Sequence, residues 1–299
     1  MICVLAILTF ATILIVVVKS NNKSRDYTEI YLRIRSWWFI VIPLFLVLIL
    51  NNTIFIIFFC LISILAFSEF ISIMPSRNSD RLIIHLVYLS IPIQYYWIFI
   101  EWYGMFMIFV PIYIFLFLPS VMVLIGETKG FIKSAGNFHW IVMLTVFFIS
   151  HTAYLINLPE KNADAGSVGL ILYLLFLTEF NDVSQFLWGK CFGRHKIIPK
   201  VSPNKTWEGF AGGLTTITII AGFASPFLTP MSVLHGFIAG FIISISGFAG
   251  DVVISSVKRD LQIKDSGSII PGHGGVLDRV DSLLYTSPLF FHYIYYLYY

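Results

Sequence analysis

Apolar runs of about 20 residues, the length that carries an α-helix across a bilayer, recur along the whole chain between short polar connections. Only helices and closed barrels satisfy their backbone hydrogen bonds inside lipid, and runs of this length favour helices. The 299 residues are 58% hydrophobic and 12% charged, and the mean hydropathy is +0.86. This composition excludes a soluble enzyme, a disordered chain and a collagen-like fibre. We therefore predict an all-α polytopic integral membrane protein.

The apolar runs predict about ten transmembrane helices. Their expected ranges are 2–18, 37–50, 53–73, 82–100, 103–125, 138–157, 167–187, 208–228, 233–254 and 282–299. The stretch 37–73 leaves two alternatives, a tight hairpin around Asn51-Asn52 or one broken helix. We divide the chain into an N-terminal part, 1–165, with about six helices, and a C-terminal half, 166–299, which carries the polar loops 188–207 and 255–281.

Lys and Arg are distributed unevenly among the connections. All but one of the 19 Lys and Arg residues fall into alternate connections, and the exception is Lys161. The connections that hold them are 19–36, 74–81, 126–137, 188–207 and 255–281. Short loops rich in Lys and Arg stay on the cytoplasmic side, so the ten-span arrangement predicts that both termini lie outside. We expect a multi-pass protein of the bacterial inner membrane whose polar loops face the cytoplasm.

Charge and cysteine content exclude further classes. The net charge of +3 is small and no long run of like charges occurs, so we expect no nucleic-acid partner. Cys3, Cys60 and Cys191 lack Cys-x-x-Cys spacing and predict neither a disulfide framework nor a thiolate metal site. The first apolar run has an uncharged start, so we expect a retained helix and not a signal peptide. No internal repeat is visible, which disfavours an inverted-repeat transporter.

A cluster of polar residues interrupts the apolar run near 179–185. Ionisable side chains at this depth normally face a cavity or a partner. The cluster consists of Glu179, Asn181, Asp182, Ser184 and Gln185. Glu69 and Glu101 stand at span ends, where we expect solvated carboxylates. Histidines in or near spans are expected to be structural, and these are His85, His139, His151, His235 and His292.

Prolines also lie inside the predicted spans. They are Pro43, Pro92, Pro111 and Pro119. A proline leaves the carbonyl four residues before it without its helical donor, and membrane helices tolerate this when the carbonyl finds another partner. We expect kinks without a further function.

The loop 188–207 is basic and rich in turn residues. Its cations are Lys190, Arg194, Lys196, Lys200 and Lys205. Ser202-Pro203 predicts the start of the next helix, with Glu208 in its first turns. An ordinary positively charged cytoplasmic loop is the alternative, but it does not explain the buried Asp182 before it.

The segment 250–281 carries the densest set of functional side chains. On a helix, Asp251, Ser255 and Lys258 line one face, and Asp278 and Asp281 are neighbours one turn apart. Two helix ends then present carboxylates on the same side at the headgroup level. Converging carboxylates repel unless a cation lies between them, and a hard oxygen site suits Mg²⁺. A ring of surface ion pairs is the alternative.

Cations and glycines surround these carboxylates. Arg side chains bind phosphate oxygens in bidentate fashion and Lys side chains as point charges. The candidates are Lys258, Arg259, Lys264 and Arg279. Gly272, Gly274 and Gly275 let the backbone approach a ligand closely, and His273 stands between them. The Walker spacing and Gly-x-Gly-x-x-Gly are absent, which excludes a P-loop or Rossmann site.

The segment resembles the signature of the CDP-diacylglycerol synthases, also called phosphatidate cytidylyltransferases. The matching residues read Ser255-x-Val-Lys258-Arg259-x4-Lys264-Asp265-x-Gly267-x2-Ile270-Pro271-x-His273-Gly274-Gly275-x2-Asp278-Arg279-x-Asp281. Upstream, Ser202-Pro203-Asn204-Lys205-Thr206-Trp207-Glu208-Gly209 is similar to the family's Ser-Pro-Lys-Lys-Thr-Trp-Glu-Gly element and departs from it at Asn204. Asp182 with Phe186, Gly189 and Lys190 resembles a third element more loosely. The resemblance covers roughly residues 179–285.

The resemblance implies the reaction of CTP with phosphatidate to give CDP-diacylglycerol and pyrophosphate. It makes 166–299 the catalytic half and places Mg²⁺ on Asp251 and Asp278, with a second cation possible. The implied catalytic residues are Lys258, Arg259, Lys264, His273 and Arg279. The implied substrate-binding residues are Asp182, Ser202, Lys205, Gly274, Gly275 and Asp281. The expected partners are CTP, phosphatidate, the lipid bilayer and, as an option, a second copy of the chain.

Three alternatives stay open. A CTP-dependent polyprenol or lipid kinase uses a similar loop and releases CDP. A CDP-alcohol phosphatidyltransferase runs the next metabolic step, but its Asp-Gly-x2-Ala-Arg element is absent. A transporter or a catalytically silent membrane scaffold explains the apolar half without accounting for the loop.

Overall fold

The computed structural model describes residues 2–21, 28–75, 77–162, 165–267 and 274–299, and most of these residues are helical. The single helices are α1 (Ile2–Asn21), α2 (Thr28–Leu50), α3 (Asn52–Ile73), α4 (Arg81–Phe99), α9 (Gly166–Phe192), α10 (Trp207–Leu228), α11 (Val233–Asp260) and α12 (Leu277–Tyr298). A short 3₁₀ turn, η1 (Asn78–Asp80), precedes α4. The predicted all-α polytopic fold is confirmed.

Two helical passages are composite. One runs through α5 (Tyr103–Ile108), the π-helical η2 (Phe109–Ile114) and α6 (Phe115–Ile125). The other runs through α7 (Phe131–Val142), the π-helical η3 (Met143–Phe148), α8 (Ile149–Tyr154) and the 3₁₀ turn η4 (Leu155–Asn157). In the stretch 37–73, the chain breaks into two helices at Asn51, whose side chain accepts a hydrogen bond from the Ile54 amide at 2.8 Å.

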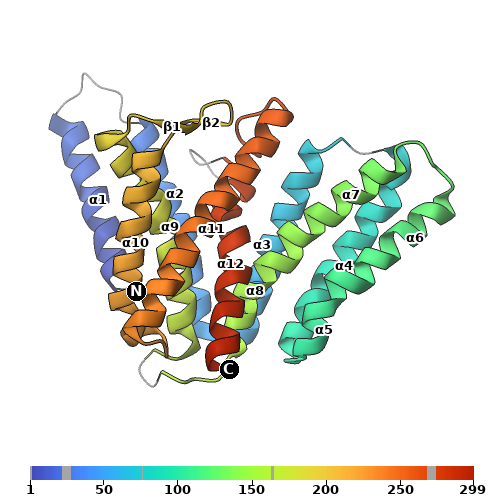
Figure 1. Cartoon of the computed structure of the whole chain (residues 1–299), viewed down its shortest axis with the longest axis horizontal. Coiled ribbons are helices and arrows are strands. Elements are labelled where there is room, and N and C mark those ends of the chain that lie inside the picture. Colours follow the sequence, from blue (N-terminus) through green and yellow to red (C-terminus); the bar gives the residue numbers. More distant parts are fainter. Residues whose placement is uncertain (1, 22–27, 76, 163–164, 268–273) are drawn as a thin grey trace.

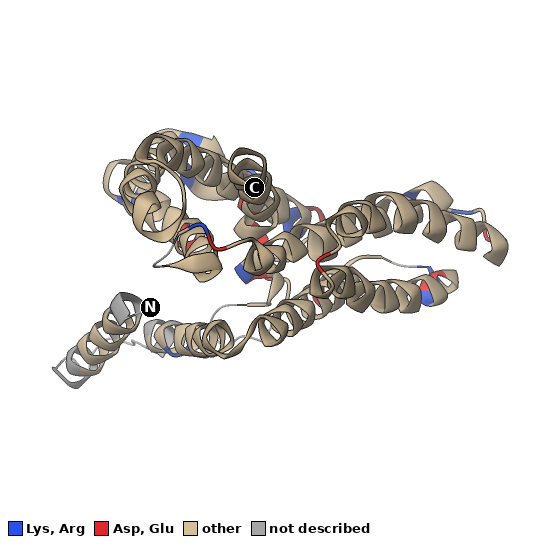
Figure 2. Ribbon diagram, turned by 90° about the horizontal axis from the view of Figure 1, so that it is seen from below, with Lys and Arg blue, Asp and Glu red and all other residues tan. Residues whose placement is uncertain are grey.

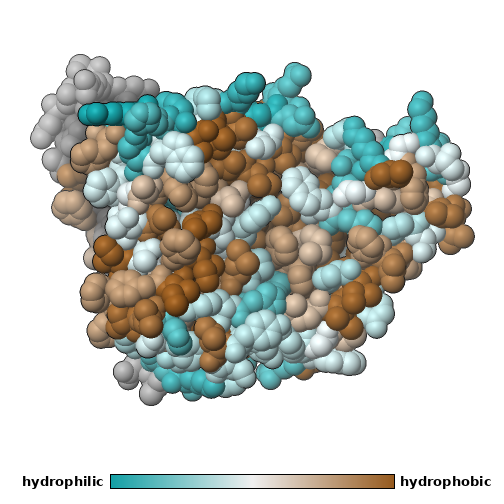
Figure 3. Space-filling model, in the orientation of Figure 1, coloured by the Kyte–Doolittle hydropathy of each residue, from teal (hydrophilic) through white to brown (hydrophobic). Residues whose placement is uncertain are grey.

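Seven helical segments of the described chain are long and apolar enough to cross a membrane. They are Asn52–Ile73, Asn78–Phe99, Tyr103–Ile125, Phe131–Asn157, Gly166–Phe192, Trp207–Leu228 and Val233–Asp260. In space-filling view, apolar side chains form a broad band between more hydrophilic edges (Figure 3). Seen from below, most of the described ribbon is tan, and the blue Lys and Arg and red Asp and Glu residues occupy a small part of it (Figure 2). The total of about ten spans stays a prediction.

The C-terminal helices α9, α10, α11 and α12 pack into one bundle, with α3 and α8 against α12 (Figure 1). Small residues allow this close packing, because a side chain at Gly240 of α11 would collide with Ala221 of α10. Buried polar groups also connect the helices. The Tyr173 hydroxyl of α9 donates to the Ala221 carbonyl at 3.0 Å, and Ser244 Oγ of α11 donates to Asn181 Oδ1 of α9 at 2.7 Å.

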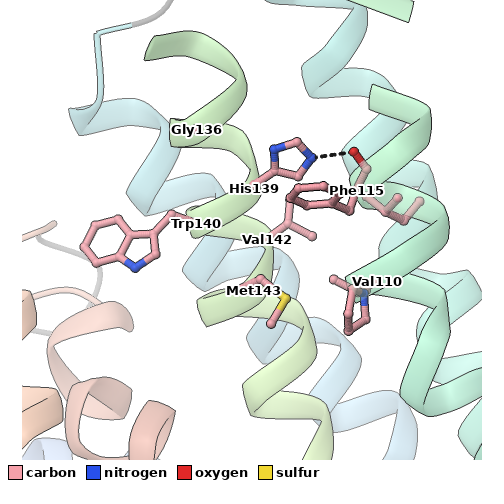
Figure 4. A pocket seen from close by; sticks show the side chains of 9 residues that line it. Val110, Phe115, Gly136, His139, Trp140, Val142 and Met143 are labelled. Carbon is pink, nitrogen blue, oxygen red and sulfur yellow. Dashed lines mark hydrogen bonds between the residues drawn. The ribbon is translucent and has the colours of Figure 1, made fainter. Parts of the chain in front are cut away.

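At Pro119, a side chain from another helix replaces the hydrogen-bond donor that the proline removes. Pro119 cannot donate to the Phe115 carbonyl, and His139 Nε2 of α7 donates to it instead, at 2.9 Å (Figure 4). A carbonyl only accepts, so His139 carries its proton on Nε2 in this contact. The contact lies in an apolar cleft of about 370 Å³ between η2 and α7. His139 is therefore structural, as predicted.

An antiparallel hairpin replaces the helix start predicted at Ser202-Pro203. Strand β1 (Lys196–Ile198) pairs with β2 (Ser202–Thr206), and α10 begins only at Trp207. Two contacts fix this boundary. Thr206 Oγ1 caps α10 by accepting from the Gly209 amide at 3.1 Å, and Glu208 accepts from the Arg194 amide at 3.0 Å across the base of the hairpin. The local prediction was wrong because tertiary contacts outweighed the preference of proline for a helix start.

The described parts of the Lys- and Arg-rich connections lie toward one end of the molecule. Figure 1 shows the β1–β2 hairpin, the last turns of α11 and the α6–α7 turn along one edge, and the C-terminal end of the chain at the opposite edge. The described residues 158–162 between η4 and α9 also lie at the edge with the C-terminal end, and Lys161 Nζ donates to the Tyr298 carbonyl there. The charge asymmetry predicts that the hairpin end faces the cytoplasm.

Candidate active site

Three aspartates from three helices of the C-terminal bundle interact toward the hairpin end. Asp182 lies on α9, Asp251 on α11 and Asp281 in the first turns of α12, and their carboxylates repel one another. Ser282 Oγ donates to Asp182 Oδ2 at 2.9 Å, and Ser255 Oγ donates to Asp251 Oδ1 at 3.1 Å. The second contact confirms that Asp251 and Ser255 share one helical face.

Strand β2 brings a cation to this carboxylate cluster. Lys205 Nζ forms an ion pair with Asp251 Oδ2 and lies 4.7 Å from the centre of the Phe248 ring. The side chains of Lys205 and Asp251 are 18% and 23% exposed, so solvent reaches both. The hairpin thus positions the lysine of the Ser-Pro-Asn-Lys element over the aspartates of the helices.

Asp278 forms a second carboxylate–lysine pair at the start of α12. Lys258 Nζ of α11 lies 2.6 Å from Asp278 Oδ1, and both side chains are nearly buried. Asp278 Oδ2 accepts from the Ser266 amide at 2.8 Å, from Ser266 Oγ at 3.0 Å and from the Gly275 amide at 3.0 Å. Burial by itself raises the pKa of the Asp278 carboxyl, but the hydrogen bonds from Lys258 and Gly275 outweigh it and hold that pKa below its usual range.

Gly274 has a backbone conformation that other residues rarely adopt, with φ at +79°. A side chain there would also collide with the Asp278 carboxylate. The glycine-rich segment therefore approaches a carboxylate of its own chain closely. Gly272 and His273 lie outside the described residues.

The remaining predicted residues occupy different surroundings. Arg259 Nε donates to the Val201 carbonyl at 3.2 Å, which connects α11 to the hairpin turn. Ser202 starts β2, and Lys264 is exposed beyond the end of α11. Arg279 is half-buried and attracted to Glu179, and its Nε has no hydrogen-bond partner among the described residues. A buried guanidinium nitrogen without a partner is suited to an anionic ligand.

The donor chemistry of the carboxylate cluster fits a hard divalent cation. In the described part of the chain, no three His, Cys, Asp or Glu side chains already stand at metal-ligand spacing. Asp182 Oδ1, however, is buried without a hydrogen-bond partner among the residues that the structure describes, next to Asp251 and Asp281. Asp278, the other ligand implied by the resemblance, is paired with Lys258. A cation bound by Asp251 and Asp278, as the resemblance implies, would have to compete with Lys205 and Lys258 for these carboxylates.

The sequence did not identify Glu69 as a neighbour of the start of α12. The prediction that its carboxylate is solvated was wrong. It lies on α3 in the N-terminal half, is 5% exposed, and accepts hydrogen bonds from the Val276 and Leu277 amides, both at 2.8 Å. Its position at the end of an apolar run gives the depth of the side chain but not the direction in which it points. The one sequence feature that could have indicated this contact is that Glu69 ends its apolar run at the same side of the membrane as the loops 188–207 and 255–281.

The chain matches the model of the cytidylyltransferase family over residues 31–297. It therefore belongs to that family, and it is a multi-pass membrane protein of the nucleotidyltransferase class with a nucleotide substrate. The most specific part of the site, the 255–281 segment, lies within the matched range.

Of the three relatives compared below, one is an uncharacterized protein and two are phosphatidate cytidylyltransferases. The chain is 43% identical over 291 residues to the uncharacterized protein YnbB of Escherichia coli (strain K12), which covers 97% of this chain and 96% of that protein. It is 35% identical over 156 residues to the phosphatidate cytidylyltransferase of Mycobacterium leprae (strain TN), with 52% of this chain and 48% of that protein covered. It is 42% identical over 121 residues to that of Staphylococcus aureus (strain COL), with 40% and 46% covered. The match spans about half the length of these phosphatidate cytidylyltransferases.

Proposed function

We propose that the protein is a phosphatidate cytidylyltransferase that converts CTP and phosphatidate into CDP-diacylglycerol and pyrophosphate. The observation that carries the proposal is the meeting of Asp182, Asp251 and Asp281 with Lys205 at the polar end of a membrane bundle. One substrate is a lipid and the other is soluble in water, so their reaction needs a charged site at the membrane boundary. The named relatives support the choice of phosphatidate.

The chemistry requires charge neutralisation more than proton transfer. A phosphate oxygen of phosphatidate is anionic near pH 7 and attacks the α-phosphorus of CTP without a general base. The new bond joins the lipid oxygen to this phosphorus, and the bond from the α-phosphorus to the oxygen bridging the α- and β-phosphates breaks, which releases pyrophosphate. The protein then acts mainly by positioning the phosphates and neutralising their charge.

The cations of the site have separate roles in this scheme. Lys205 and Lys258 each exchange a carboxylate partner for a phosphate oxygen, and Arg279 offers its free Nε. Asp251 and Asp278 are the residues that would hold Mg²⁺ and any second cation, and Asp182 and Asp281 interact with Asp251. Bound Mg²⁺ supplies the positive charge that stabilises a pyrophosphate leaving group. The site faces the cytoplasm of a bacterial inner membrane in this proposal.

The position of the label in CTP distinguishes the proposed reaction from its closest alternative. Purified protein is incubated with Mg²⁺, phosphatidate and CTP labelled at either the α- or the γ-phosphate. Transfer of the α-label to lipid with release of labelled pyrophosphate from γ-labelled CTP supports the cytidylyltransferase. Transfer of the γ-label to lipid with release of CDP identifies a lipid kinase. Absence of CTP binding supports a transporter or scaffold.

A panel of lipid phosphates tests the second substrate. Phosphatidate is compared with polyprenyl phosphate under the same conditions, because both present an anionic monophosphate at the membrane surface. Preference for phosphatidate is expected. Preference for the polyprenyl compound would overturn the lipid assignment and leave cytidylyl transfer intact.

A further inference from the structure

Helix α3 of the N-terminal half contributes Glu69 to the start of α12. Glu69 Oε1 accepts from the Val276 amide and Oε2 from the Leu277 amide, each at 2.8 Å. Ser266 Oγ lies 3.4 Å from the same Oε2. With 5% of its surface exposed, the carboxylate depends on these donors for its hydrogen bonding.

The two amides belong to the unsatisfied donors at a helix start. The first N–H groups of a helix have no partner inside it, and a negative charge there also interacts favourably with the helix dipole. Val276, the residue before α12, provides no side-chain cap. Glu69 therefore supplies from another helix the cap that α12 lacks.

The same carboxylate packs against the segments that hold Asp278. A side chain at Gly275 would overlap the Glu69 carboxylate, and one at Gly267 would come within 2.9 Å of Glu69 Oε1. The Gly275 amide and Ser266 donate to Asp278 on the other side. The backbone of Ser266 and Gly275 therefore lies between the carboxylates of Glu69 and Asp278 and contacts both.

We infer that Glu69 is a positioning residue for the proposed nucleotidyl transfer: it fixes the first turn of α12 and thereby orients Asp278, Arg279 and Asp281 toward the substrates. This role rests on the function proposed above. It also makes the N-terminal half a part of the catalytic apparatus, since α3 provides the carboxylate.

Asp80 is the matched control because it is a buried carboxylate with a purely structural environment. It is 1% exposed, accepts from the Arg77 amide at 2.9 Å and from Ser134 Oγ at 2.8 Å, and connects the start of α4 to α7. Asp80 thus matches Glu69 in burial and in having an amide and a serine donor, but it also pairs with the Arg77 guanidinium at 2.7 Å. Among the described residues, it has no hydrogen bond to α12.

The test compares Glu69→Gln with Asp80→Asn in protein reconstituted into lipid nanodiscs. We expect Glu69→Gln to lower kcat by about tenfold or more, as for other residues that orient ligand-bearing groups. Glutamine keeps the shape but turns an NH₂ group toward one of the two amide donors. Asp80→Asn is expected to lower the melting temperature and to leave kcat per folded molecule unchanged. Equal losses of kcat in the two variants, or normal kcat in Glu69→Gln, overturn the inference.

Hydrogen exchange provides a readout that does not depend on activity. In the wild-type protein, the Val276 and Leu277 amides are expected to exchange slowly, and Glu69→Gln is expected to accelerate them by about tenfold or more while Asp80→Asn does not. Exchange of these wild-type amides at the rate of an unstructured peptide overturns the inference even if the variant fails to fold. If the wild-type protein leaves phosphatidate unchanged, the proposed function fails, whereas the exchange result still tests the contact.

Discussion

Replacing Asp251 and Asp278 separately by Asn should give the same loss of activity but different losses of stability. Asp278 is nearly buried, pairs with Lys258 at 2.6 Å and accepts three further hydrogen bonds. Asp278→Asn removes the charge that balances Lys258, so it should destabilise the fold by about 2–4 kcal/mol.

Asp251→Asn perturbs a more solvated pair. Asp251 and Lys205 are 23% and 18% exposed, and an ion pair with this access to water contributes about 1 kcal/mol or less. The substitution also relieves repulsion from Asp182 and Asp281, which offsets part of the loss. The melting temperature of Asp251→Asn should therefore stay close to that of the wild type.

Both variants should lose turnover by about 100-fold or more, because each removes a carboxylate that the proposal assigns to Mg²⁺. The double variant should be barely worse than either single one, since groups that act as a unit are not additive. The assay is transfer of α-labelled CTP to lipid per folded molecule, as a function of Mg²⁺, together with thermal unfolding. Asp260→Asn, an exposed aspartate on α11, is the control.

Two results would refute the reasoning. Near-normal Mg²⁺-dependent turnover in either variant removes that carboxylate from the metal site. A fall in melting temperature for Asp251→Asn as large as that for Asp278→Asn contradicts the difference in solvation between the two ion pairs.

Three other outcomes are expected. Lys258→Ala or Arg279→Ala should lower kcat/KM by the equivalent of about 1.5–3 kcal/mol, one charge-assisted phosphate contact, and normal kinetics in both folded variants would leave them only an orienting role. In cells expressing protein without Cys3, Cys60 and Cys191, an impermeant thiol reagent should label Glu160→Cys but not Lys200→Cys, and the reverse pattern would invert the topology. His139→Ala should destabilise the protein by about 1–3 kcal/mol by leaving the Phe115 carbonyl unpaired, and Pro119→Ala in that background should recover stability by restoring its helical donor; no recovery would disprove this account.

The sequence predicts the helices well because the physical signal for a membrane helix is local. An apolar run of sufficient length must satisfy its own backbone, so composition alone identifies segments such as Gly166–Phe192 and Val233–Asp260. The hairpin 196–206 was not predictable in this way. Its pairing depends on Trp207 donating to the His195 carbonyl and on Glu208 binding the backbone of Arg194, contacts that no window of sequence reveals.

Within the site, local spacing again succeeded where the partners share a helix. Asp251 and Ser255 are four residues apart and do form a hydrogen bond. The partners of the two predicted metal ligands were not foreseen, because Lys205 reaches Asp251 from a strand and Lys258 reaches Asp278 from the preceding helix. Sequence spacing predicts which residues share a face of one helix. It does not predict contacts between different helices or strands, because these depend on how the elements pack.

Glu69 and Glu101 show the same limit at single residues. Both end an apolar run and have the same expected depth in the membrane, so hydropathy assigns them equal solvation. In the structure, Glu101 is exposed in a turn with φ at +57°, whereas Glu69 is buried against α12. The difference arises because α3 packs on α12 and turns Glu69 toward unsatisfied amides. A carboxylate at a span end thus has a low desolvation energy only while it faces water. When it faces the protein interior, it needs hydrogen-bond donors, and for Glu69 these are the Val276 and Leu277 amides at the start of the helix that carries Asp278 and Asp281.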